Sequence, residues 1–174
     1  YSVFAVDLYG KGIRPTELND KIAQTKYLYS NRDEMRKRLN AGFEKAKELG
    51  ANVSNTLGMG YCFGGSAILE MARSGADLKA FVPFHGNLAT PANEDYKNIK
   101  GKIVVFHGSA DTVVPFSEFA SLAVELEKTG INHEMTTYSG APHAFTVFGA
   151  KSYREDADKK SWKRFTEVLE ETLK

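Results

Sequence analysis

Short continuous runs of apolar residues alternate along the chain with longer segments in which apolar residues recur every three or four positions. The continuous runs are typical of buried strands, and the wider spacing is typical of amphipathic helices. The pattern predicts strands at residues 1–8, 55–61, 78–85, 102–107 and 132–138. It predicts helices at residues 17–29, 33–49, 66–73, 117–129 and 155–173.

The order of these elements predicts the fold class. Strands that alternate with helices are typical of an α/β protein, in which a mostly parallel sheet is flanked by helices on both faces. Ligands of such sheets bind beyond the carboxyl ends of the strands. Four residues with reactive side chains fall at or just after the ends of predicted strands: Cys62, His85, Asp111 and His143. We therefore expect a ligand site where these residues lie.

Composition narrows the kind of partner. The chain has 174 residues, one cysteine and a formal net charge of +1, with basic and acidic residues interspersed. The length fits a single domain over residues 1–174, and the charge balance predicts no nucleic-acid or membrane partner. We expect a small-molecule ligand and a monomer or weak homo-oligomer. The single cysteine, together with the lack of a membrane-span or signal-peptide pattern, favours the cytoplasm.

The segment 59–65, Met-Gly-Tyr-Cys-Phe-Gly-Gly, lies between a predicted strand and a predicted helix. Gly-x-Cys-x-Gly at such a junction is typical of a nucleophile elbow, in which Cys62 projects from a tight turn into a cleft. Gly60 and Gly64 would be needed there because a Cβ at either position would collide within the turn. The alternative is that Cys62 is a small buried hydrophobic residue without a chemical role.

Two later loops favour the catalytic interpretation. Gly-Ser-Ala-Asp, ending at Asp111, follows one predicted strand, and a Pro-His pair, ending at His143, follows the last strand. Nucleophile, acid and histidine in this chain order are typical of α/β-hydrolases. We predict that His143 takes the proton of Cys62 and that Asp111 fixes the tautomer of His143 and favours its charged form. The backbone N–H of Phe63, at the positive end of the next helix, would stabilise an oxyanion.

Four segments together resemble the dienelactone hydrolases, also called carboxymethylenebutenolidases. They are Asp-Leu-Tyr-Gly at 7–10, Gly-Tyr-Cys-Phe-Gly-Gly at 60–65, Gly-Ser-Ala-Asp with a following Val-Pro at 108–115, and Pro-His-Ala-Phe at 142–145. The resemblance runs over nearly the whole chain. It implies an α/β-hydrolase fold and hydrolysis of an enol-lactone ester by acyl transfer through Cys62.

The resemblance further implies N-terminal strands, a second oxyanion donor and a glutamate that helps to ionise the thiol. The sequence contains none of these, so we expect the chain to be N-terminally incomplete relative to the family. It also implies two arginines that hold a substrate carboxylate. Arg14 is the candidate for the first, with Lys11 as the alternative, whereas Thr-Val-Phe at 146–148 offers no cation for the second. The side chains at 146–148 cannot form a bidentate anion clamp. We therefore expect the substrate to be a small ester, lactone or thioester other than the dienelactone itself.

Three further residues are candidate substrate contacts, with packing as the alternative for each: Tyr61, His85 and Phe145. His85 and His107 both end predicted strands, and with Cys62 and His143 they have the ligand types of a zinc site. Their spacing in the sequence matches no compact zinc motif. We therefore predict no metal and no other cofactor.

Two other classes of function remain as alternatives. A hydrolase-like binding or regulatory protein, which keeps the fold but has lost turnover, would fit the altered anion clamp. A redox-sensing thiol would fit as well, because an activated cysteine is also readily oxidised.

Overall fold

A computed structural model describes all residues from 1 to 174 and divides the chain into two compact units, Tyr1–Val53 and Ser54–Lys174. The first unit is helical, and the second contains the sheet. The single domain over residues 1–174 stays a prediction.

The first unit consists of an extended N-terminal segment followed by α1 (Leu18–Ser30) and α2 (Arg32–Glu48). Both helices confirm the sequence pattern, but the strand predicted at 1–8 is wrong, because these residues form no strand. An apolar run becomes a strand only where another strand accepts its backbone hydrogen bonds, and this unit contains no strand. The segment is instead held by α2, where Arg38 donates hydrogen bonds to the carbonyl oxygens of Leu8 and Tyr9 at 2.8 and 2.9 Å.

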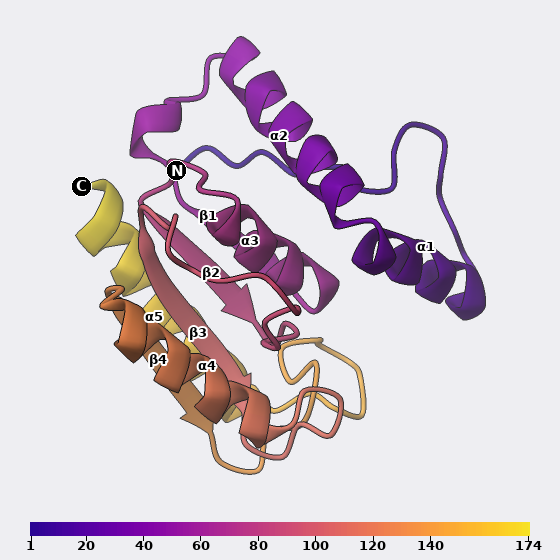
Figure 1. The fold of residues 1–174 in the computed structure, drawn as a ribbon. Coiled ribbons are helices and arrows are strands. Elements are labelled where there is room, and N and C mark those ends of the chain that lie inside the picture. The colour runs from indigo at the N-terminus through magenta and orange to yellow at the C-terminus, as the bar shows by residue number, and fades with distance from the viewer. The chain divides into compact units, whose positions relative to one another are not determined.

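The second unit is built on a parallel sheet. Its strands follow the order of the sequence: β1 (Gly58–Tyr61), β2 (Ala80–Phe84), β3 (Lys102–Gly108) and β4 (His133–Tyr138). All neighbouring pairs are parallel, so the carboxyl ends of the strands meet at one edge, as the arrows in Figure 1 show. The predicted parallel sheet is confirmed. Its first strand is shorter than expected, because a 3₁₀ helix, η1 (Val53–Asn55), precedes it.

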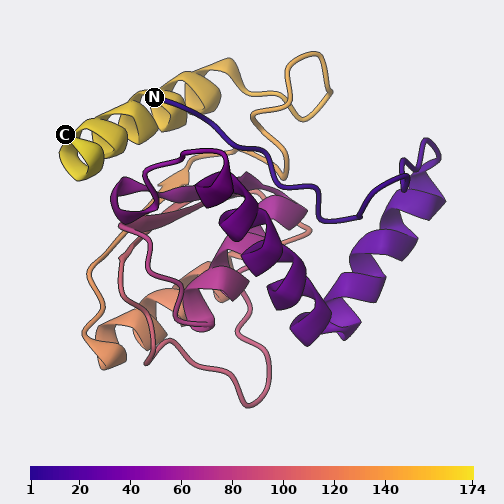
Figure 2. The same cartoon turned by 90° about the horizontal axis from the view of Figure 1, so that it is seen from above.

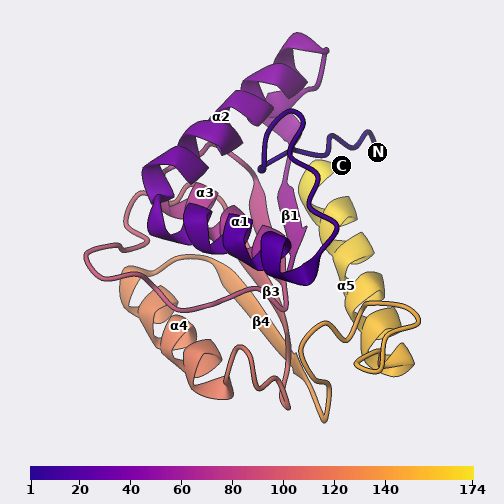
Figure 3. The ribbon, with the colours of Figure 1, turned by 90° about the vertical axis from the view of Figure 1, so that its right-hand side faces the viewer.

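Helices cover both faces of this sheet. Figures 2 and 3 show α3 (Phe63–Arg73) and α4 (Phe116–Thr129) on one face and α5 (Glu155–Leu173) on the other. The alternation of side chains along β3 produces the two layers. Ile103 and Val105 belong to the core under α3 and α4, whereas Val104 and Phe106 pack with residues of α5. None of the helices combines the length and the apolar character needed to cross a bilayer.

One large apolar residue of α5, Trp162, lies outside the side of the helix that faces the sheet. Phe165 and Val168 are buried, but Trp162 is 52% exposed. The buried residues of the helix recur at intervals of three or four: Ala157, Ser161, Phe165 and Val168. Trp162 lies one position away from this stripe, which rotates its side chain by about 100° away from the sheet.

A buried ion pair within α3 is hydrogen-bonded to the connection between β2 and β3. Arg73 donates a hydrogen bond to the Glu70 carboxylate at 2.7 Å and another to the hydroxyl of Tyr96, also at 2.7 Å. Both charged side chains are almost fully buried. The pair therefore ties the long connection to the helix that carries the elbow.

We expect Arg73→Met to lower the free energy of unfolding by about 3–5 kcal/mol, because the substitution removes the Arg73 guanidinium from the buried Glu70 carboxylate. The double variant Glu70→Leu with Arg73→Met should recover part of that loss, since it removes the buried carboxylate together with the guanidinium. Urea unfolding at neutral pH, followed by circular dichroism, measures both. A double variant less stable than Arg73→Met alone would contradict the ion-pair interpretation.

Candidate active site

Cys62 occupies the turn between β1 and α3. Its backbone lies in the left-handed region, with φ 49° and ψ −118°. A non-glycine residue in this region is strained, and such strain is typical of functional turns. The N–H of Cys62 still donates to the carbonyl of Phe84 at 3.1 Å, which extends the pairing with β2 by one residue. The sharp turn predicted from the sequence is therefore present.

Glycines permit the turn because they have no side chains. A Cβ on Gly60 would lie 2.2 Å from the carbonyl carbon of Gly64, so only glycine fits at position 60. The expectation for Gly64 is wrong, because a Cβ there would meet nothing within 4 Å. The second close approach instead joins Gly65 and Gly86, where a Cβ on Gly86 would lie 2.8 Å from the backbone of Gly65. This contact brings the loop after β2 against the first turn of α3.

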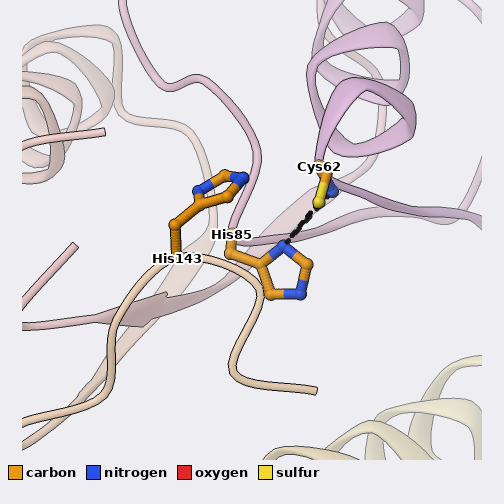
Figure 4. A group of neighbouring side chains, drawn as sticks. All are labelled: Cys62, His85 and His143. Carbon is orange, nitrogen blue, oxygen red and sulfur yellow. Dashed lines mark hydrogen bonds between the residues drawn. The ribbon is translucent and has the colours of Figure 1, made fainter. Parts of the chain in front are cut away.

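His85 lies directly beneath the sulfur because of that contact. It follows the last residue of β2 with φ 38°, and its Nδ1 lies 3.3 Å from Cys62 Sγ (Figure 4). The same Nδ1 accepts the backbone N–H of Cys62 at 3.3 Å, and Nε2 lies 2.8 Å from Thr146 Oγ1. A neutral imidazole with the proton on Nε2 satisfies all of these contacts, and Nε2 then donates to Thr146.

The pKa values of the pair agree with a neutral thiol beside a neutral imidazole. Burial, followed by the nearby charge of His143, lowers the pKa of His85 to about 4. Burial, followed by the negative charge of Asp111, raises the pKa of the Cys62 thiol. The thiol therefore keeps its proton at neutral pH and donates a hydrogen bond to His85 Nδ1.

Asp111 serves its own loop and His143 at the same time. Its Oδ1 accepts the backbone N–H groups of Val113 and Val114, both at 2.8 Å, and its Oδ2 lies 2.9 Å from His143 Nδ1. The carboxylate is fully buried, whereas the His143 side chain is 24% exposed. Asp111 thus stabilises its own turn and contacts His143 with the same carboxylate.

The fold brings three of the predicted residues together at the carboxyl ends of the strands. One side-chain ligand atom each from Cys62, His85 and His143 lies within 4.8 Å of the others. Figure 4 shows the three side chains converging from separate segments of the chain. The hydrogen-bond partner of the sulfur is His85 rather than His143, so a small movement of the thiol would be needed to reach the His143–Asp111 pair.

The other candidate contacts are placed differently. Phe145 is fully buried and packs against the rings of His85 and Tyr138 at 5.3 and 5.5 Å, so packing describes its role in this structure. Tyr61 is 39% exposed, and its ring lies 4.6 Å from that of Phe84. Burial, followed by the charge of Asp158, raises the pKa of Tyr61. Phe63 is the first residue of α3, directly after the elbow cysteine.

Arg14 lies in the first unit, in an exposed loop. Its guanidinium pairs with Asp7 at 3.0 Å and donates hydrogen bonds to the carbonyl oxygens of Gly10 and Ile13. The fit of Arg14 to a substrate carboxylate stays a prediction.

Two further residues complete the description of the site. His107 ends in the core of the second unit, where Nε2 donates to the Val114 carbonyl at 2.9 Å, and it does not join the cluster. Thr146, which orients His85, was not identified as functional from the sequence. The sequence does carry a signal for the two histidines. Phe-His-Gly occurs at the carboxyl end of both β2 and β3, and Phe84 lies opposite Phe106 in the register. The repeated tripeptide marks two histidines at the same edge of the sheet.

Comparison with known proteins places this arrangement in a family. The sequence model of the dienelactone hydrolase family matches residues 1–173. A Synechocystis sp. protein named "Putative carboxymethylenebutenolidase" is 28% identical over 124 residues, which are 67% of this chain and 50% of that protein. The chain spans about half the length of the curated relatives it matches.

Solved structures show the same fold. A dienelactone hydrolase-like promiscuous phosphotriesterase from metagenomic libraries has a TM-score of 0.88 and 25% identity, covering 98% of this chain and 74% of its own. An α/β hydrolase from a Medee basin deep-sea metagenome library has a TM-score of 0.62 and 19% identity, covering 93% of this chain and 66% of its own. The predicted α/β-hydrolase fold is confirmed.

Gly60→Ala should destabilise the protein by about 1–3 kcal/mol, because the added Cβ overlaps the backbone of α3. Gly64→Ala is the matched control. Its Cβ meets open space, and alanine favours the helix by up to about 1 kcal/mol. Urea unfolding of both variants measures the difference. Equal stabilities would mean that the turn relaxes around a Cβ at position 60.

The pKa of His85 makes stability depend on pH. The unfolded chain binds a proton at this residue near pH 6.5, whereas the folded chain binds it only near pH 4, so stability present above pH 6.5 is lost as the pH falls towards 4. Between pH 7 and pH 5 this contribution falls by about 2 kcal/mol. In His85→Gln the loss over that interval should be smaller by the same amount, as urea unfolding at the two pH values would show. An unchanged loss would place the titration elsewhere.

Proposed function

We propose, because the chain belongs to the dienelactone hydrolase family, that it hydrolyses a small ester, lactone or thioester by acyl transfer through Cys62. The observation that carries the proposal is the position of Cys62 on a strained elbow, with a histidine held by a buried carboxylate within reach. A buried cysteine without a chemical role would need neither.

His143 is the better candidate for the base. A general base works best when its pKa lies near the working pH, and a pKa of about 4 makes His85 a weak base at neutral pH. His143 is partly exposed, so it can exchange protons with a leaving group. Asp111 fixes a proton on Nδ1 of His143, which leaves Nε2 of His143 to accept the thiol proton.

The reaction follows from these positions. The thiol turns from His85 to His143, whose Nε2 takes the proton as the sulfur attacks the carbonyl carbon. The tetrahedral intermediate then breaks its bond to the leaving atom, oxygen in an ester or lactone and sulfur in a thioester, which takes the proton from His143. Water, deprotonated by the same nitrogen, attacks the thioester carbon and releases the acid and the thiol.

The elbow also supplies electrostatic stabilisation. The backbone N–H of Phe63 stands at the start of α3, where the helix dipole is positive. An oxyanion formed beside Cys62 would lie next to this end of the helix. We assign Phe63 the role of one oxyanion donor.

The residues after His143 argue for a substrate without a carboxylate at this side. Thr146 is engaged with His85 Nε2 at 2.8 Å, and neither Val147 nor Phe148 carries a charge. Tyr61 and Phe148 contribute exposed aromatic surface. Uncharged side chains of this kind suit a neutral acyl or alcohol group.

Hydrolysis of p-nitrophenyl acetate tests the proposal. We expect Cys62→Ala to abolish turnover, and His143→Ala to lower kcat by about 10²–10⁴-fold, the usual contribution of a general base. His85→Gln is the control for the identity of the base and should lower kcat less than His143→Ala. The reverse order would make His85 the base.

Equal rates for the wild type and Cys62→Ala would refute the hydrolase and favour a binding or regulatory protein. Alkylation of Cys62 by iodoacetamide, followed against pH, separates the redox alternative. A sensing thiol would react readily below neutral pH, whereas the raised pKa of Cys62 predicts a midpoint above that of free cysteine.

A further inference from the structure

The cluster of Cys62, His85 and His143 has the form of a metal site in which every ligand is already oriented. Each histidine uses one ring nitrogen for a supporting hydrogen bond: His143 Nδ1 to Asp111 and His85 Nε2 to Thr146. That leaves His143 Nε2 and His85 Nδ1 to coordinate, and a metal at His85 Nδ1 would replace the hydrogen bonds that this nitrogen accepts from Cys62. Histidine ligands of zinc are typically supported by a carboxylate or other acceptor in this way.

The separations are close to those that a metal requires. With Zn–S near 2.3 Å and Zn–N near 2.0–2.1 Å, ligand atoms in a tetrahedral site lie about 3.5 Å apart. Cys62 Sγ and His85 Nδ1 are already 3.3 Å apart, and all three ligand atoms lie within 4.8 Å of one another. A shift of about 1 Å, mainly in the partly exposed His143, would complete the set.

The donor set and its surroundings select the kind of metal. A thiolate and two imidazoles suit zinc and disfavour magnesium and calcium, which prefer oxygen ligands. The thiolate and the hydrogen-bonded Asp111 carboxylate together supply negative charge opposite a divalent ion. His85 is buried, whereas His143 is partly exposed. Three protein ligands leave the fourth position to water.

We propose that Cys62, His85 and His143 bind one zinc ion, and that the bound ion masks the Cys62 nucleophile. On binding, the thiol loses its proton to solvent, and a sulfur lone pair and one lone pair from each imidazole form bonds to the metal. The sulfur can then no longer attack an electrophile, and His143 can no longer accept a proton. Metal binding does not depend on the proposed hydrolysis, but its meaning as an off-switch rests on that function.

The sequence offers these ligand types, but their spacing predicts no metal because the three residues are distant from one another along the chain. Cys62, His85 and His143 follow three different strands, β1, β2 and β4. A spacing search finds zinc motifs only where ligands are near one another in sequence. The parallel sheet instead brings the ends of its strands together, and the contact between Gly65 and Gly86 places His85 beside the sulfur.

Cobalt(II) titration of the purified chain tests binding, because cobalt replaces zinc and gives absorption bands that report its ligands. We expect one cobalt per chain, visible d–d bands of a tetrahedral site and a near-ultraviolet thiolate-to-cobalt band that zinc abolishes. Cys62→Ala should remove the thiolate band. His85→Gln and His143→Gln should each weaken binding by about tenfold or more, whereas His133→Gln, outside the cluster, should not.

A second pair of variants leaves all three ligands in place. Thr146→Val removes the hydrogen bond to His85 Nε2 and should weaken cobalt binding by about 10–100-fold, the usual effect of losing such support. Thr146→Ser keeps the hydroxyl and should bind as the wild type does. Binding that lacks the thiolate band, or that is unchanged in His85→Gln, would overturn the site.

Alkylation by iodoacetamide tests the masking step without reference to hydrolysis. Zinc in slight excess should slow alkylation of Cys62 by about tenfold or more, and EDTA should restore the rate. Unchanged alkylation in zinc-saturated protein would overturn the masking. If p-nitrophenyl acetate is not cleaved even with EDTA while cobalt binds through sulfur, the proposed hydrolysis fails and the metal site stands.

Discussion

Contact between backbone atoms around the start of α3 is the constraint on which the site depends. Gly60 lies against Gly64, and Gly65 lies against Gly86, in each case at distances that admit no Cβ. The first contact creates the strained turn that presents Cys62. The second brings the end of β2 over the helix, so that His85 reaches the sulfur.

The tripeptide Phe-His-Gly shows how position within the sheet decides the role of a residue. His107 lies inside β3, so its side chain follows the alternation of the strand into the core and donates to Val114. His85 lies one residue beyond β2, at positive φ, and its side chain turns towards the elbow. The glycine after each histidine permits a close approach, Gly86 to α3 and Gly108 to the backbone of Ala141. Through Gly108, the loop that carries His143 is drawn towards the end of β3.

The sequence could predict what depends on local pattern. Apolar runs and helical spacing located all four strands and the five helices, and the order of Cys62, Asp111 and His143 indicated which strand ends hold the chemistry. It failed where the answer depends on contacts that are distant in sequence. Residues 1–8 have the composition of a strand, but a strand also requires a partner. The hydrogen bond from His85 to Thr146 joins two loops whose separation no periodicity encodes.

The glycine contacts also make the backbone of the elbow independent of the side chain at position 62. The turn at position 62 is held by the absence of side chains at neighbouring positions, and the Cys62 side chain takes no part in closing it. The chain can therefore exchange sulfur for oxygen at this position, or lose the nucleophile altogether, while the elbow keeps its shape. The shape of the elbow and the chemistry of the residue that it presents are therefore set by different positions of the chain.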